Sequence, residues 1–84
     1  MTRGNAKKLA ALLKKEFGGK VTFEDVSGKG NYRFTINTKR FNDMAQLSRQ
    51  DAIWDLVNRE FPRELILDIT LILAHAPHDF VLAA

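Results

Sequence analysis

The stretch from Lys20 to Asn37, which reads KVTFEDVSGKGNYRFTIN, decides the fold of this chain. In both halves of the stretch apolar side chains alternate with polar ones, and the apolar positions are Val21, Phe23, Tyr32, Phe34 and Ile36. Alternation with a period of two is typical of a strand that buries one face. The run SGKGN between the halves is rich in turn-forming residues. The stretch therefore predicts a β-hairpin with strands over 20–26 and 32–37.

A helix is predicted on the N-terminal side of this hairpin. Its apolar side chains recur at helical spacing, and they are Leu9, Leu12, Leu13 and Phe17. Asn5 is a residue type that caps helix starts, and the pair Gly18-Gly19 is typical of a helix end. The helix is therefore expected to begin at Asn5 and to stop before the glycines.

Two helical segments are predicted on the C-terminal side of the hairpin. The segment 41–47 has an apolar residue at every third position, which indicates one or two short turns packed against the core. Ser48 and Asp51 then resemble a capping box, with Asp in place of the usual Glu. A long helix is therefore expected over 49–61, and Pro62 ends it.

The last predicted element is a strand over 65–74. One set of alternating positions is entirely apolar and is predicted to face the core: Leu65, Leu67, Ile69, Leu71 and Leu73. The other set is more polar and is predicted to face away from the core: Ile66, Asp68, Thr70, Ile72 and Ala74.

The order of these elements, αββααβ, predicts an α+β fold with a three-stranded mixed sheet and helices packed on one face. The other face is expected to be open and to present Thr22, Glu24, Arg33, Thr35, Asn37, Asp68 and Thr70. With 84 residues the chain is long enough for one domain, predicted over 1–84 with its core at about 7–79 and a tail at 80–84.

Composition narrows the classes of function. The chain has no cysteine, which excludes disulfides, thiolate metal sites and a cysteine nucleophile supplied by this chain. The apolar run 65–74 is about half the length needed to span a membrane, so a cytoplasmic protein without a membrane segment is expected. The net charge of +3 permits attraction to polyanions.

No converging set of catalytic groups is visible in the sequence, so a non-enzymatic protein is predicted. His75 and His78 are the only histidines, and they flank Pro77. That proline argues against a helix that would bring both imidazoles to one metal. With Asp79 the two histidines could form a loose surface site, but a metal site is not expected, and His75 is the only candidate ligand carried forward.

Three local patterns accompany the predicted element order. The run Asp25-Val26-Ser27-Gly28-Lys29-Gly30 places an acidic residue and Ser-Gly in the loop between the first strands. The stretch 40–49, RFNDMAQLSR, leads from a phenylalanine into an arginine at the start of the long helix, and Pro77-His78-Asp79 places an acidic residue after a proline. These patterns resemble the BolA family, in which the second one reads Phe-x-Gly, and which shares its element order with type II KH-like folds. The resemblance covers roughly 7–79.

The sequence departs from the family at residues that matter for function. Family members have glycine where this chain has Asp43, and histidine where it has Gln50. The resemblance also implies a histidine at the start of the last strand, and that position falls on Leu67 or on Asp68.

The resemblance implies partnership with a monothiol glutaredoxin through a shared [2Fe-2S] cluster. In the family that strand histidine and a second His or Cys in the loop ligate the cluster, whereas the loop here offers Lys29. No cofactor is therefore expected unless the iron–sulfur role survives by substitution, for which His75 is the nearest imidazole.

Two functions are carried forward from the sequence. The first is a BolA-like binding or adaptor module that contacts nucleic acid, and its predicted contacts are Lys29, Arg33, Lys39, Arg40 and Arg49. The alternative is an iron–sulfur accessory protein that partners a monothiol glutaredoxin. Ile66 and Ile72 on the predicted polar face, followed by the apolar residues 80–82, leave open a monomer or a weak homodimer.

Overall fold

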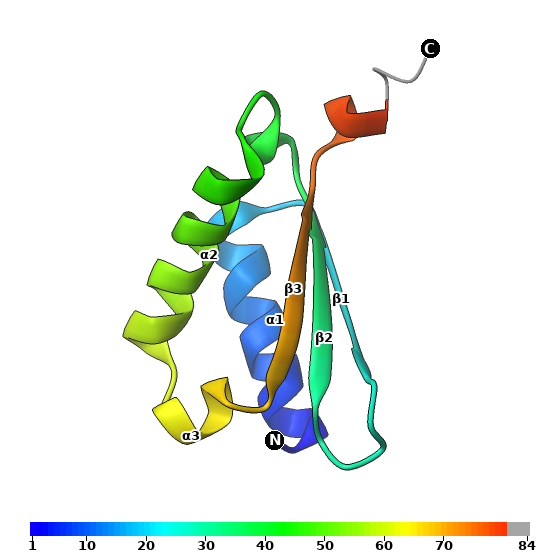
Figure 1. Cartoon of the computed structure of the whole chain (residues 1–84), viewed down its shortest axis with the longest axis vertical. Helices are drawn as coiled ribbons and strands as arrows, with labels where there is room; N and C mark the ends of the chain where they lie inside the picture. The colour runs from blue at the N-terminus through cyan, green and yellow to red at the C-terminus, as the bar shows by residue number, and fades with distance from the viewer. Residues whose placement is uncertain (81–84) are drawn as a thin grey trace.

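Three strands form one sheet in the order β1-β2-β3 (Figure 1). The computed structural model describes residues 1–80. The strands are β1 (Lys20–Asp25), β2 (Tyr32–Asn37) and β3 (Ile69–His75). The helices are α1 (Arg3–Phe17), α2 (Gln46–Glu60) and α3 (Arg63–Ile66), with the 3-10 turns η1 (Lys39–Phe41) and η2 (Pro77–Phe80).

The sheet is mixed, as the sequence predicts. β1 and β2 pair antiparallel as a hairpin in which Phe23 lies opposite Phe34. β3 pairs parallel to β2, and α2 and α3 lie between these two strands along the chain. The predicted α+β class and the αββααβ order are confirmed, and α3 adds one short turn before the last strand.

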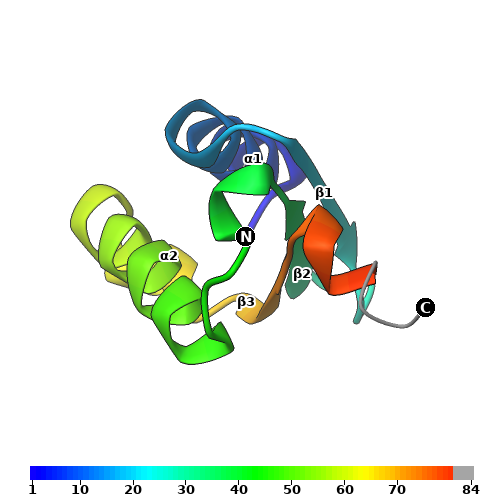
Figure 2. The ribbon, with the colours of Figure 1, turned by 90° about the horizontal axis from the view of Figure 1, so that it is seen from above.

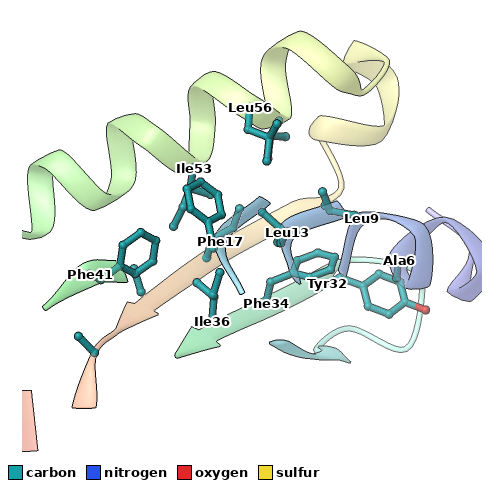
Figure 3. Packing of buried hydrophobic residues seen from close by; sticks show 14 residues of the cluster. Ala6, Leu9, Leu13, Phe17, Tyr32, Phe34, Ile36, Phe41, Ile53 and Leu56 are labelled. Atoms are coloured by element: carbon teal, nitrogen blue, oxygen red, sulfur yellow. The ribbon is translucent and has the colours of Figure 1, made fainter. Parts of the chain in front are cut away.

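Both long helices pack against the same face of the sheet (Figure 2). α1 contacts β1 and β2, whereas α2 contacts β3. Figure 3 shows the core between the helices and the sheet. Its largest fully buried side chains include Leu9, Leu13, Phe34, Ile36, Ile53 and Ile72. Tyr32 is buried with them, so the aromatic side chains of β2 serve the core.

The structure corrects both predicted helix starts. Thr2, and not Asn5, caps α1, because its side-chain oxygen accepts a hydrogen bond from the backbone N–H of Asn5. The predicted end of α1 is confirmed, since Gly18 follows its last residue with a φ of 73°. α2 begins at Gln46, so Ser48 lies inside the helix and the predicted capping box is wrong.

The segment before α2 is shorter than predicted. η1 covers only Lys39–Phe41, and Phe41 is buried, whereas Leu47 is 74% exposed in the first turn of α2. Asp43 has a φ of 64°, in the left-handed region that glycine adopts most readily and aspartate tolerates. This backbone conformation agrees with the glycine that the family resemblance places at this position.

The prediction for the last strand is wrong in its start and in its buried face. Residues 63–66 form α3, and β3 begins only at Ile69. Ile72 and Ala74 are buried, whereas Leu71 is 45% exposed. The pairing moves from Tyr32 opposite Ile69 to Arg33 opposite Leu71, so Thr70 has no partner on β2. This bulge inverts the alternation of side chains.

The inverted alternation removes the reason given for self-association. Ile72 lies in the core and Ile66 packs against it, so neither isoleucine covers the open face. Residues 81 and 82, which completed that argument, lie outside the described residues. The open face carries the predicted residues of β1 and β2, and β3 adds Leu71, Leu73 and His75 to it in place of Asp68 and Thr70.

Candidate nucleic-acid interface

The solvent face of α1 carries four lysines, Lys7, Lys8, Lys14 and Lys15, and all are exposed. An α-helix has about 3.6 residues per turn, so positions seven apart lie nearly above one another. The four lysines therefore share one face, and the buried residues Ala6, Leu9, Leu13 and Phe17 lie on the opposite face. Glu16 is the only acidic residue among the first 23, so this face is almost purely cationic.

η1 adds two cations at the C-terminal end of α1. The guanidinium of Arg40 donates a hydrogen bond to the Glu16 backbone oxygen at 2.6 Å. The hydroxyl of Thr38 donates to the Phe17 backbone oxygen at 2.7 Å and accepts from the Arg40 N–H. These bonds fix Lys39 and Arg40 beside the last turn of α1, where the helix dipole favours cations.

Lys20 extends this group of cations to the end of the sheet. It is the first residue of β1 and lies opposite Asn37, the last residue of β2. We call the whole set the basic stripe: Lys7, Lys8, Lys14, Lys15, Lys20, Lys39 and Arg40. It follows α1 and passes over the end of the sheet at which α1 finishes, which is the upper end of the sheet in Figure 1.

Lys29 lies at the other end of the hairpin, in the loop at the bottom of Figure 1. The carboxylate of Asp25 organises this loop by accepting hydrogen bonds from the backbone N–H groups of Ser27, Gly28 and Gly30. Six residues of β2 separate the loop from η1, which corresponds to about 20 Å. Lys29 therefore does not join Lys39 and Arg40 in one patch.

Arg33 lies on the open face of the sheet, away from α1. Its guanidinium forms an ion pair with Glu24, which lies directly opposite it on β1. The two residues line a shallow polar hollow of about 340 Å³ together with Thr22 and Thr35. Because Glu24 offsets its charge, Arg33 adds little positive potential to this face.

Arg49 corrects the predicted set, because its side chain is buried in the structure. Its Nη1 and Nη2 atoms donate to the two carboxylate oxygens of Asp79 at 2.7 and 2.9 Å. Its Nε donates to the Met44 backbone oxygen at 2.9 Å, and Nη1 also donates to the Ala74 oxygen. With only 4% of its surface exposed, Arg49 is a structural residue and not a phosphate contact.

Asp79, the partner of Arg49, has a strongly lowered pKa. The side-chain hydrogen bonds from Arg49, and then the backbone N–H of Ala76, hold the pKa of Asp79 far below its usual range. The pair ties η2 to the start of α2. The Pro-x-acidic pattern noted in the sequence thus holds the chain after β3 in place.

The positions that correspond to the family's cluster ligands do not fit an iron–sulfur cluster. Leu67 is 76% exposed and apolar, and the carboxylate of Asp68 pairs with the amino group of Met1. Lys29 occupies the loop position, and His75 lies at the far end of β3 from Asp68. Clusters of this type require thiolate or imidazole ligands, and these side chains provide neither at the matching places. Residues 1–80 also contain no group of three or more acidic or histidine side chains suited to a metal.

Sequence reasoning missed most of the basic stripe. Lys7, Lys8, Lys14 and Lys15 are not among the nucleic-acid contacts predicted from the sequence. The signal that identifies them is the near absence of acids from residues 1–23, combined with the seven-residue spacing of the lysine pairs. Lys20 could not be added from sequence, because its proximity to η1 depends on the hairpin register.

Comparison with known proteins supports the fold. No protein-family profile matches the sequence, and no curated protein matches it. Among solved structures, the BolA domain of SufE1 from Arabidopsis thaliana is similar with a TM-score of 0.72 and 23% identity, over 94% of this chain and 99% of that one. BolA1 from Arabidopsis thaliana is similar with a TM-score of 0.71 and 21% identity, over 93% and 98% of the two chains.

These similarities show that the chain has the BolA fold. The likeness covers nearly all of the chain and nearly all of each solved domain, so the match is to a whole domain. The family resemblance seen in the sequence is confirmed at the level of fold. Within residues 1–80 no helix is long and apolar enough to cross a membrane.

Proposed function

We propose that this chain is a non-enzymatic BolA-like module that binds the phosphate backbone of nucleic acid through the basic stripe. The observation that carries the proposal is the gathering of seven exposed cations along α1 and over its C-terminal end, with Glu16 as the one acid among the first 23 residues. Lysine and arginine side chains that neutralise phosphates release condensed counterions, and this release drives binding.

The charge on the other helices supports one orientation of the bound nucleic acid. The exposed side chains of α2 and α3 include four acids, Asp51, Asp55, Glu60 and Glu64. Arg59 forms ion pairs with Asp55 and Glu60, which offsets its charge. The electrostatic potential around α2 and α3 therefore does not favour a polyanion, whereas the potential around α1 does.

A salt titration tests the proposal. Binding of a fluorescently labelled oligonucleotide, followed by anisotropy, is expected to weaken steeply between about 50 and 200 mM salt. The double variant Lys14→Ala/Lys15→Ala should reduce the magnitude of the slope of log K against log salt by about 1.4 to 1.8, since each lost phosphate contact removes about 0.7 to 0.9. Absence of binding by the intact chain at low salt would refute the proposal.

Matched variants locate the interface. Arg59→Ala/Arg63→Ala removes the same charge from α2 and α3 and should leave the slope unchanged. Lys29→Ala and Arg33→Ala test the other residues predicted from sequence. We expect little change from either, because Lys29 lies at the far end of β2 and Arg33 is paired with Glu24. If those variants weaken binding more than Lys14→Ala/Lys15→Ala, the interface lies on the hairpin and not on α1.

The alternative function, an iron–sulfur accessory role with a monothiol glutaredoxin, rests on the fold alone. Leu67, Asp68 and Lys29 offer no thiolate or imidazole at the matching positions. Under our proposal, adding this protein to a cluster-loaded glutaredoxin leaves the visible absorption and circular dichroism of the cluster unchanged. A new spectrum that is lost in His75→Ala would support the alternative.

A further inference from the structure

A hollow of about 440 Å³ lies where the basic stripe meets the end of the sheet. Its lining residues are Gly19, Lys20, Asn37, Thr38, Lys39 and Pro77. The exposed surface of the hollow is mainly apolar, although two of its residues are lysines, because lysine stems and the proline ring contribute carbon atoms. None of these six lining residues is acidic. Apolar walls beside cations suit a ligand that has both a flat apolar part and a negative charge.

The walls of this hollow are held in place by the fold. Gly19 has a φ of 74°, and a Cβ at this position would collide with the Asn37 backbone oxygen, so only glycine permits the close approach of the two chain segments. On the other side, Pro77 begins η2. The N–H of Ala76 donates to Asp79, whose carboxylate is bound by Arg49. The buried arginine therefore determines where Pro77 lies.

We propose that this hollow is a nucleotide subsite that takes one unpaired base of a single-stranded nucleic acid, an inference that rests on the proposed function. The base packs against Pro77 and the backbone at Gly19, and the flanking phosphates lie near Lys20 and Lys39. Asn37 supplies a side-chain amide, which has both a donor and an acceptor for the edge of a base. Binding of single strands commonly combines a cationic path with surfaces on which bases stack.

The placement of the cations also favours a single strand over a duplex. The α1 lysines lie on the outer face of the helix, whereas Lys20 alternates with Thr22 and Glu24 on the open side of the sheet. A chain that contacts both groups must turn over the end of the molecule. Duplex DNA is stiff over about 150 base pairs, and its bases are stacked and paired, so it fits this path poorly. A single strand bends easily and has bases to insert.

Three probes of equal length, measured at the same salt concentration, test the subsite. They are a single-stranded oligonucleotide, its duplex, and a strand of abasic sites with the same phosphates. The single strand is expected to bind about 10-fold tighter than the abasic strand, within the range measured for one stacked base. Equal binding of the three probes per phosphate would overturn the subsite and leave the proposed function intact. Absence of binding to any of the three at low salt would overturn both.

Uncharged substitutions locate the base. Pro77→Ala and Asn37→Ala are expected to lose most of the roughly 10-fold preference for the single strand over the abasic strand, with no change in the salt slope. Asn58→Ala, an exposed asparagine on α2, is the matched control and should retain the preference. Thermal unfolding of each variant verifies that it is folded. If both variants at the hollow retain the full preference, the base binds elsewhere and the assignment is wrong.

Discussion

α1 and α2 are both 15 residues long and each buries four residues, but they differ in what they do with their basic side chains. The buried residues of α1 are all apolar, and its four lysines lie in solvent. α2 buries Arg49 among its apolar residues and places the guanidinium against Asp79. One helix exposes its basic side chains to solvent, and the other uses a basic side chain to hold the fold together.

α2 is also bonded to the sheet through its polar side chains. The amides of Gln46 and Gln50 donate to the backbone oxygens of Ala74 and Ile72, at 2.7 and 2.9 Å. These oxygens belong to β3, which is an edge strand. The side chains of α2 therefore provide hydrogen-bond donors to carbonyl groups at the edge of the sheet. No side chain of α1 makes a comparable bond to the sheet in the hydrogen bonds of residues 1–80. The comparison teaches that the type of a charged residue does not reveal its role, whereas its partners do.

The largest expected effect separates the two kinds of basic residue. Arg49→Ala removes four hydrogen bonds and leaves Asp79 without its cation, so the free energy of unfolding should fall by about 2 to 3 kcal/mol. Lys14→Ala should change it by less than about 0.5 kcal/mol. Urea denaturation measures both. A small effect of Arg49→Ala, together with weakened nucleic-acid binding, would contradict the structural role of Arg49.

Acid titration addresses the same ion pair. The hydrogen bonds from Arg49, followed by that from the Ala76 N–H, lower the pKa of Asp79 in the folded state below its unfolded value of about 3.9. A lowered carboxyl pKa stabilises the fold above the unfolded pKa, and the contribution is lost as the pH falls below about 4. The intact protein should therefore lose more stability than Asp79→Asn between pH 5 and about pH 2 in urea titrations. Parallel curves for the two proteins would contradict this assignment.

Gln50, also on α2, should contribute less than Arg49 to the free energy of unfolding. Its amide donates to the Ile72 oxygen and accepts a hydrogen bond from the indole N–H of Trp54 at 3.1 Å. Gln50→Ala should lower the free energy of unfolding by about 1 to 1.5 kcal/mol. Tryptophan emission should change in the folded state, because the indole loses its partner. Lys15→Ala is the control on α1, and it should leave both stability and emission unchanged.

The smallest expected effects concern the starts of the helices. Thr2 caps α1, so Thr2→Ala should lower the free energy of unfolding by about 1 kcal/mol. Ala45 precedes α2 without a side-chain cap, so Ala45→Ser should raise it by up to about 1 kcal/mol. For a chain of this size each change corresponds to about 4 to 8 °C in Tm. If Thr2→Ala left the free energy of unfolding unchanged, or if Ala45→Ser lowered it, the difference between the two helix starts would be contradicted.

The hairpin and α1 were predictable because their patterns are local. Alternation over 20–37 assigned Tyr32, Phe34 and Ile36 to the core, and the structure confirms that all three are buried. Helical spacing identified Leu9, Leu13 and Phe17 in the same way. For the candidate interface, Lys39 and Arg40 were predicted from sequence. The α1 lysines were not, because a lysine on a helix surface is ordinary until its neighbours are known.

β3 could not be predicted in the same way, because both of its faces are rich in apolar residues. The positions Leu65, Leu67, Ile69, Leu71 and Leu73 form an apolar set, but Ile66, Ile72 and Ala74 form another. Which set is buried depends on the start of the strand after α3 and on the bulge at Thr70. Neither feature leaves a clear signal in the sequence.

By itself the amino-acid sequence determined the α+β order, the hairpin with its buried face and the apolar face of α1, because each depends on contacts between near neighbours in the chain. Only the tertiary structure decided the buried face of β3, the structural role of Arg49 and the joining of Lys20, Lys39 and Arg40 to the α1 lysines. Each of these depends on a partner that is distant in sequence: Arg49 meets Asp79 across 30 residues, and Arg40 meets the end of α1 across 24. Such contacts exist only after the chain has folded.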